Sequence, residues 1–153
     1  MINKDRLSRF QRTMGWTSGY GEGWALYAER LMDELGYFSD PGYELGFLSD
    51  QALRAARIVV DIGMHLGLTV PTSQKYETAG MVIDYDFSVD FLQRRALQQY
   101  PSAQSETVRY LGWPGQAISY KLGEKYMIAA REEAKARKGD AFDLKKWHFE
   151  LLD

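Results

Sequence analysis

Glu22 is the first residue whose surroundings could carry chemistry, because it stands between Gly21 and Gly23 where a helix is expected to begin. The flanking glycines leave room for an ion, so the carboxylate could ligate a metal. It could equally favour the positive end of the helix dipole. Glu29 lies seven residues later and returns to the same face of the helix. The pair is therefore either a metal ligand with a supporting carboxylate or a solvated stripe.

A second group, Arg57, Asp61 and His65, is spaced at four-residue steps in the most apolar stretch of the chain. This spacing places all three side chains on one face of a helix. Because unpaired buried charges are costly, the stripe must be internally paired, solvated or facing a polar cavity. Two interpretations stay open: ion pairing that stabilises the helix, or a site in which His65 is a donor or general acid and Asp61 fixes its tautomer.

A third group follows the tight corner Trp113-Pro114-Gly115-Gln116. A helix that starts at a Gly-Gln pair presents free backbone N–H groups, which could hold a carboxylate or an oxyanion. Tyr120 and Lys121 come one turn later and are suited to stabilising negative charge. Aromatic packing beside a surface lysine is the alternative.

The composition limits what these groups could do. The chain has 153 residues, of which 45% are hydrophobic, enough for one globular domain with a core. Its 19 Lys and Arg against 21 Asp and Glu give a net charge of −2, which argues against nucleic acid or an anionic membrane as a partner. The absence of cysteine excludes thiolate chemistry, so any metal site would depend on carboxylates and on His65 or His148.

We expect a cytoplasmic protein from the hydropathy pattern. No stretch approaches the roughly 20 apolar residues that a membrane span requires. Residues 1–12 are charged and lack the apolar region of a secretory signal.

Apolar residues recur at three- and four-residue steps through most of the chain, which predicts a single all-α domain over 1–153. The expected helices are 5–14, 22–35, 43–66, 87–99, 103–111, 116–138 and 142–152. The glycine-rich segment 15–21 is expected to be a loop or a helix junction in which backbones approach closely. The segment 67–86 is expected to be a loop, with 81–83 either extended or the start of a helix.

Three blocks of this sequence resemble the C-terminal part of the bacterial family called domain of unknown function 885. They are Y-G-E-G-W-A-L-Y-A-E-R-L at 20–31, R-A-A-R-I-V-V-D-I-G-M-H at 54–65 and W-P-G-Q-A-I-S-Y-K-L-G at 113–123. The resemblance covers about residues 7–152, with an altered loop expected at 67–86. That family resembles helical zinc peptidases of the gluzincin type, so the fold implied is that of the C-terminal half of a zincin-like peptidase.

The resemblance also implies roles for particular residues. Glu22 matches the place of the third zinc ligand, and His65 and Tyr120 match a histidine and a tyrosine set against the tetrahedral intermediate. The remaining implied residues are Arg57, Gln116 and Lys121 for substrate binding and Glu29 and Asp61 in support of the site.

One part of the family pattern is missing from this sequence. In relatives an H-E-x-x-H segment, which supplies two zinc ligands and the general base, comes shortly before the E-G-W block. Here the 21 residues ahead of Glu22 contain no histidine. We therefore expect a C-terminal piece of a longer polypeptide, a truncated gene product or an expressed fragment, which alone binds no stoichiometric zinc and hydrolyses no peptide. Zinc is expected in full-length relatives only.

Two other functions stay open. The chain could be a stand-alone helical binding module that holds a small carboxylate or a peptide, or a degenerate gene product without function. Loss of a covering N-terminal half would expose an apolar patch, for which Trp16, Trp24, Tyr27 and Trp113 are the candidates. We therefore expect either a homo-oligomer, a symmetric dimer in the simplest case, or association with the missing portion.

Overall fold

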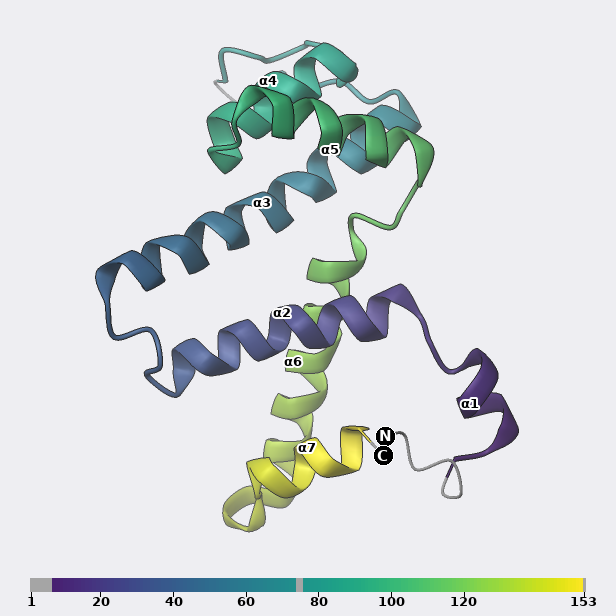
Figure 1. Ribbon diagram of the computed structural model, residues 1–153, viewed down its shortest axis with the longest axis vertical. Helices are drawn as coiled ribbons and strands as arrows, with labels where there is room; N and C mark the ends of the chain where they lie inside the picture. The colour runs from purple at the N-terminus through teal and green to yellow at the C-terminus, as the bar shows by residue number, and fades with distance from the viewer. Residues whose placement is uncertain (1–6, 74–75, 153) are drawn as a thin grey trace.

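The computed structural model describes residues 7–73 and 76–152, which form seven α-helices and one short 3-10 helix (Figure 1). These elements are α1 (Arg9–Met14), α2 (Ser18–Glu34), α3 (Pro41–Leu66), α4 (Tyr85–Ala96), α5 (Tyr100–Gly112), α6 (Ser119–Lys138), η1 (Gly139–Ala141) and α7 (Leu144–Leu152). In this described part the one strand-like pairing is an isolated antiparallel bridge between Thr69 and Val82. The expectation of an all-α fold is confirmed.

Side-chain caps set the starts of four helices. Each of these residues has extended backbone angles, and its side chain accepts a hydrogen bond from a backbone N–H of the first turn. They are Ser8 before α1, Thr17 before α2, Asp40 before α3 and Asp84 before α4. Gly67, with φ +59°, ends α3 in the left-handed conformation that favours glycine.

The helices pack around two main apolar clusters. One joins α2, α6 and α7 and is formed by Tyr27, Met127, Ala134 and Trp147. The other joins α3, α4 and α5, with Leu53, Val60, Leu92 and Tyr110 among its members, and also includes Ala117. Ala117 belongs to the corner 113–118, which connects α5 to α6. The corner therefore links the two packed groups, which Figure 1 shows below and above it.

The glycine-rich segment differs from the expectation, because α2 already begins at Ser18 and includes Gly19 and Gly21. The reason is the crossing of α2 and α6. A Cβ added to Gly123 would lie 1.9 Å from the carbonyl oxygen of Gly19, and one added to Gly23 would lie 2.5 Å from the Gly123 backbone. These glycines therefore let two helix backbones touch, and only the expected close approach is confirmed.

Two other expectations on the α2–α6–α7 side were wrong. Tyr27, expected in an exposed patch, is 0% exposed because it lies at the centre of this cluster, whereas Trp16 and Trp113 are 73% and 59% exposed. The basic run 131–138, at the end of the expected helix 116–138, is typical of a solvated helix end. Arg131 is instead buried, and it pairs with Glu34 of α2 at 2.7 Å.

Several helix ends also lie away from their expected positions. Pro41 and Pro101 occupy the first turns of α3 and α5, where the missing N–H of proline costs nothing, so both helices begin earlier than expected. α6 begins at Ser119 instead of Gln116. Val82 pairs with Thr69, so the segment 81–83 is extended and does not start a helix. Of the residues in the expected elements, 5, 6, 74 and 75 lie outside the described part of the chain, as does residue 153.

The glycine crossing generates the first prediction. The Gly123→Ala variant should be destabilised by about 2 kcal/mol, because the methyl group meets backbone that cannot move without separating the helices. Gly46→Ala is the matched control: Gly46 lies inside α3 with open space around it, so alanine should stabilise by up to about 1 kcal/mol. Thermal unfolding followed by circular dichroism checks both, and a Gly123→Ala midpoint at or above that of the parent chain would contradict the proposed contact.

Candidate functional site

A network of polar side chains connects α2, α3, α5 and the corner before α6. Its centre is Glu106 of α5, whose Oε2 atom accepts hydrogen bonds from Arg57 Nη2 at 2.8 Å, from Arg109 Nη2 at 3.0 Å and from the Tyr110 hydroxyl. Arg57 Nε donates to the Tyr110 hydroxyl oxygen at 2.8 Å. Two guanidinium groups thus share one carboxylate oxygen, so these groups together retain one positive charge.

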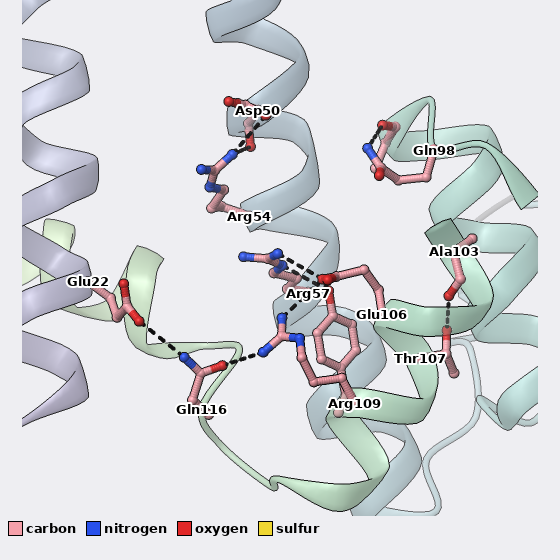
Figure 2. Close-up of polar contacts among 12 residues, drawn as sticks. Glu22, Asp50, Arg54, Arg57, Gln98, Ala103, Glu106, Thr107, Arg109 and Gln116 are labelled. Carbon is pink, nitrogen blue, oxygen red and sulfur yellow. Dashed lines mark hydrogen bonds and ion pairs between the residues drawn. The ribbon is translucent and has the colours of Figure 1, made fainter. Parts of the chain in front are cut away.

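Gln116 extends this network to Glu22 (Figure 2). Its Oε1 atom accepts from Arg109 Nη1 at 2.7 Å, and its Nε2 atom donates to Glu22 Oε1 at 3.2 Å. Since the amide oxygen is held by Arg109, the amide NH₂ must face Glu22. In the described residues nothing else donates to the Glu22 carboxylate.

Asp61 of α3 makes a separate connection to the same corner. The Gly115 N–H donates to its two carboxylate oxygens at 3.1 and 3.3 Å, and His65 Nδ1 lies 3.0 Å from Asp61 Oδ1 and 2.8 Å from the Asp61 carbonyl oxygen. Asp61 is 2% exposed, whereas the His65 side chain is 26% exposed. The expected face of α3 therefore holds Arg57 and Asp61 buried, each paired with a different part of the chain, with His65 at its outer end.

Tyr120 lies beside this network on the first turn of α6. The guanidinium carbon of Arg57 is 5.1 Å from the centre of its ring, and that of Arg54 is 5.8 Å away. Distances of this size are those of cation–π contacts. Arg54 also pairs with Glu29 of α2 at 3.5 Å and with Asp50 at 2.9 Å.

The structure does not bring Lys121 to the network. Its Nζ atom donates to Glu124 Oε2 at 2.9 Å and to Gln51 Oε1, and Arg30 Nε donates to the other Glu124 oxygen at 2.9 Å. Glu124 is 3% exposed, and its single negative charge is shared by both cations. Lys121 is therefore occupied in holding α6 to α3 and α2.

The sequence interpretation missed Glu106, Arg109, Tyr110 and Arg54. The first three are spaced i, i+3 and i+4 in α5, which places them on one helix face. That spacing is the signal that could have found them, in the same way that it found the stripe on α3.

The charges in the network shift two pKa values. Burial alone would raise the pKa of Glu106, but hydrogen bonds from Arg109 and Tyr110 and the nearby charge of Arg57 outweigh it and lower this pKa to about 2. Burial and the hydrogen bond to Glu106 raise the pKa of Tyr110. Glu106 is thus firmly ionised and Tyr110 firmly neutral near pH 7, as a structural network requires.

Metal binding by these residues would be incomplete. The described residues contain no group of three His, Asp or Glu side chains placed to hold one metal ion. Glu22 suits a zinc ligand, since an oxygen-donor carboxylate held by Gln116 has the supporting hydrogen bond that such ligands usually carry. It offers one ligand of the three that a catalytic zinc needs.

The geometry thus defines an all-α protein with a preformed polar site at a helix corner. The chain belongs to the family of bacterial proteins of unknown function DUF885, whose model matches residues 1–153. A solved structure similar to it is that of the putative lipoprotein from Colwellia psychrerythraea, with 34% sequence identity and a TM-score of 0.80. That match covers 98% of this chain and 23% of the Colwellia chain, so this chain spans about a quarter of the neighbour's length. A comparison with curated proteins found no match.

None of the described helices combines the length and apolar character needed to cross a membrane.

Glu106 generates the second prediction. Its pKa lies below the ordinary value of 4.5 in the folded chain, so the stability that it contributes is present above about pH 4.5 and is lost as the pH falls towards about 2. Glu106→Gln should therefore lower the free energy of unfolding near neutral pH by about 3 kcal/mol and flatten its decline in acid.

Urea unfolding at a series of pH values measures this effect. Glu133→Gln is the control, because Glu133 forms an exposed pair with Arg137 at 3.9 Å and should change the stability by less than about 0.5 kcal/mol. Parallel pH profiles for the parent chain and Glu106→Gln would show that this carboxylate does not carry the acid sensitivity.

Proposed function

We propose that this chain is the C-terminal segment of a zinc-dependent peptidase, to which it contributes a zinc ligand and substrate-facing side chains. The observation that carries the proposal is the hydrogen bond from Gln116 to Glu22, which fixes a carboxylate beside the corner. Membership of the family and the likeness to one quarter of a longer chain support the view that the remaining groups come from other polypeptide.

Glu22 is the proposed third zinc ligand, and Gln116 is its supporting residue. Gln116 donates through its NH₂ to Oε1 of Glu22 and so fixes the orientation of this carboxylate, as supporting residues of metal ligands do. In turn Arg109 prevents the amide from rotating, because rotation would place its NH₂ against a guanidinium. When bound, zinc would supply a Lewis acid and an activated water.

Arg57 and Tyr120 are the proposed substrate-facing pair. Arg57 uses Nε and Nη2 within the network, while its Nη1 atom has no partner among the described side chains and backbone. The Tyr120 ring lies against the Arg57 guanidinium and limits the rotation of this guanidinium. This arrangement suits binding of a peptide carboxylate or carbonyl oxygen by Arg57, and Tyr120 with His65 would stabilise the negative charge that develops during peptide hydrolysis.

The chain alone is proposed to be inactive, because its sequence contains no H-E-x-x-H segment. Glu22 cannot hold zinc tightly without two further ligands, and within the described ranges no group of three or more His, Asp or Glu side chains is placed to hold a metal ion.

Zinc analysis generates the third prediction. The purified chain should hold well under one equivalent of zinc, and a mixture with an N-terminal fragment of a relative that carries H-E-x-x-H should hold one. Gln116→Ala should weaken zinc binding by the mixture about 10- to 100-fold, as removal of a supporting residue typically does. Gln104→Ala, on the exposed side of α5, is the matched control and should leave it unchanged.

One equivalent of zinc at micromolar affinity in the chain alone would overturn the proposal that the site is incomplete. Absence of zinc from both samples would favour the binding module instead, with Arg57, His65 and Tyr120 as the residues for ligand screening.

The fourth prediction concerns assembly. Large apolar side chains are exposed on α1 and next to it, namely Phe10, Met14 and Trp16 at 65–73%. We propose that a second copy of this chain covers them when the N-terminal portion is not supplied, which gives a dimer in the cytoplasm. Light scattering should report twice the chain mass, reduced by Trp16→Ser, and a monomer at high concentration would contradict this expectation.

A further inference from the structure

Asp61 is a buried carboxylate to which the proposed function gives no role of its own, and it contacts both His65 and the corner residue Gly115. Its carboxylate is 2% exposed, and within the described chain its hydrogen-bond donors are the Gly115 N–H and the His65 ring. A buried carboxylate without a cation of its own is costly, so its position requires these donors.

The contacts of His65 fix which ring nitrogen carries the proton. Nδ1 lies 2.8 Å from the carbonyl oxygen of Asp61 and 3.0 Å from its carboxylate oxygen Oδ1. Both oxygens are acceptors only, so Nδ1 must be the donor. In the neutral ring Nε2 is then unprotonated and presents its lone pair away from Asp61, on a side chain that is 26% exposed.

We propose that Asp61 is a positioning residue that makes His65 a proton acceptor through Nε2. A neutral ring in this tautomer cannot donate from Nε2 to an oxyanion. Nε2 can therefore donate to an oxyanion only after it has accepted a proton, and the imidazolium formed in this way carries one N–H on each ring nitrogen. Asp61 accepts from Nδ1 in both states of the ring.

The same carboxylate holds the corner that carries Gln116. Gly115 has φ +79°, and its N–H points to Asp61 at 3.1 Å from Oδ2. The next residue, Gln116, donates to Glu22. Asp61 therefore fixes the orientation of His65 and the position of the group that holds Glu22, which places a proton acceptor and the proposed metal ligand under the control of one side chain.

This inference rests on the proposed function for what His65 faces, but its test does not need zinc or a second fragment. The chain has two histidines, His65 and His148, so nitrogen NMR of the uniformly labelled chain gives two sets of ring signals. The spectra are recorded well above the ordinary histidine pKa of about 6.5, where both rings are neutral. We expect His65 to show the Nδ1–H tautomer in the parent chain.

Asp61→Asn is the matched variant, because the amide keeps the shape of the side chain and removes its charge. The NH₂ group of the new asparagine must face either His65 or Gly115. If it faces His65, Nδ1 has to act as an acceptor; if it faces Gly115, two N–H groups oppose each other. The share of the Nε2–H tautomer of His65 should rise, and the Gly115 amide should exchange its hydrogen faster. His148 bonds to the Tyr27 hydroxyl at 2.8 Å, so its unchanged signals report that the variant is folded.

Asp90→Asn is the control for loss of a carboxylate, since Asp90 is an exposed partner of Arg94 on α4 and should alter neither signal. An Nε2–H tautomer of His65 in the parent chain would overturn the inference, and that measurement requires no variant. An unchanged His65 tautomer in folded Asp61→Asn would also overturn it, because the backbone carbonyl alone would then set the tautomer. Either result would leave the zinc proposal intact, which is tested by metal content.

Discussion

The direct contact of two helix backbones is the constraint on which the site depends. α2 and α6 touch at Gly23 and Gly123, neither of which has room for a Cβ, and the carbonyl oxygen of Gly19 also lies against Gly123. Since Glu22 is next to Gly23 and the corner at Gln116 comes just before α6, this contact sets the distance between the two side chains. A wider crossing would separate the Glu22 carboxylate from the amide that holds it.

A second constraint is that the charges near the corner are shared and not simply paired. Glu106 accepts from Arg57, Arg109 and Tyr110 through one oxygen, and Glu124 accepts from Arg30 and Lys121. Each carboxylate ties at least two helices or turns together. The polar groups thus connect the two apolar clusters, which have no residue in common, and the same groups orient the candidate site.

Sequence periodicity predicted the helices and the residues on the polar face of α3, because both depend on local spacing. It could not show that Arg57 pairs with Glu106 of α5, or that Lys121 donates to Gln51 of α3, because those partners depend on how the helices cross. The glycines at 19 and 21 were assigned to a loop since glycine breaks isolated helices. In α2 the carbonyl oxygen of Gly19 lies against Gly123 of α6, and the Trp16 ring lies against Gly21; no helical periodicity contains these contacts. Two donors of Glu106, Arg109 and Tyr110, could have been found from their spacing in α5, whereas its third donor, Arg57 of α3, depends on the packing of the two helices.

The linking of distant parts of the chain has a consequence for how the protein folds. The helices α3, α4 and α5 of one cluster follow one another in the chain, from Pro41 to Gly112, and only Ala117 of that cluster lies beyond them. By contrast, Glu22 and Gln116 are 94 residues apart, so their meeting requires closure of a long loop. We infer that α3, α4 and α5 form the early folding unit and that α2 docks onto α6 afterwards. The candidate site is then assembled in the last step of folding and is the first to be lost when the chain unfolds partially. Its amide hydrogens therefore exchange with solvent through a partially unfolded state in which α3, α4 and α5 remain folded.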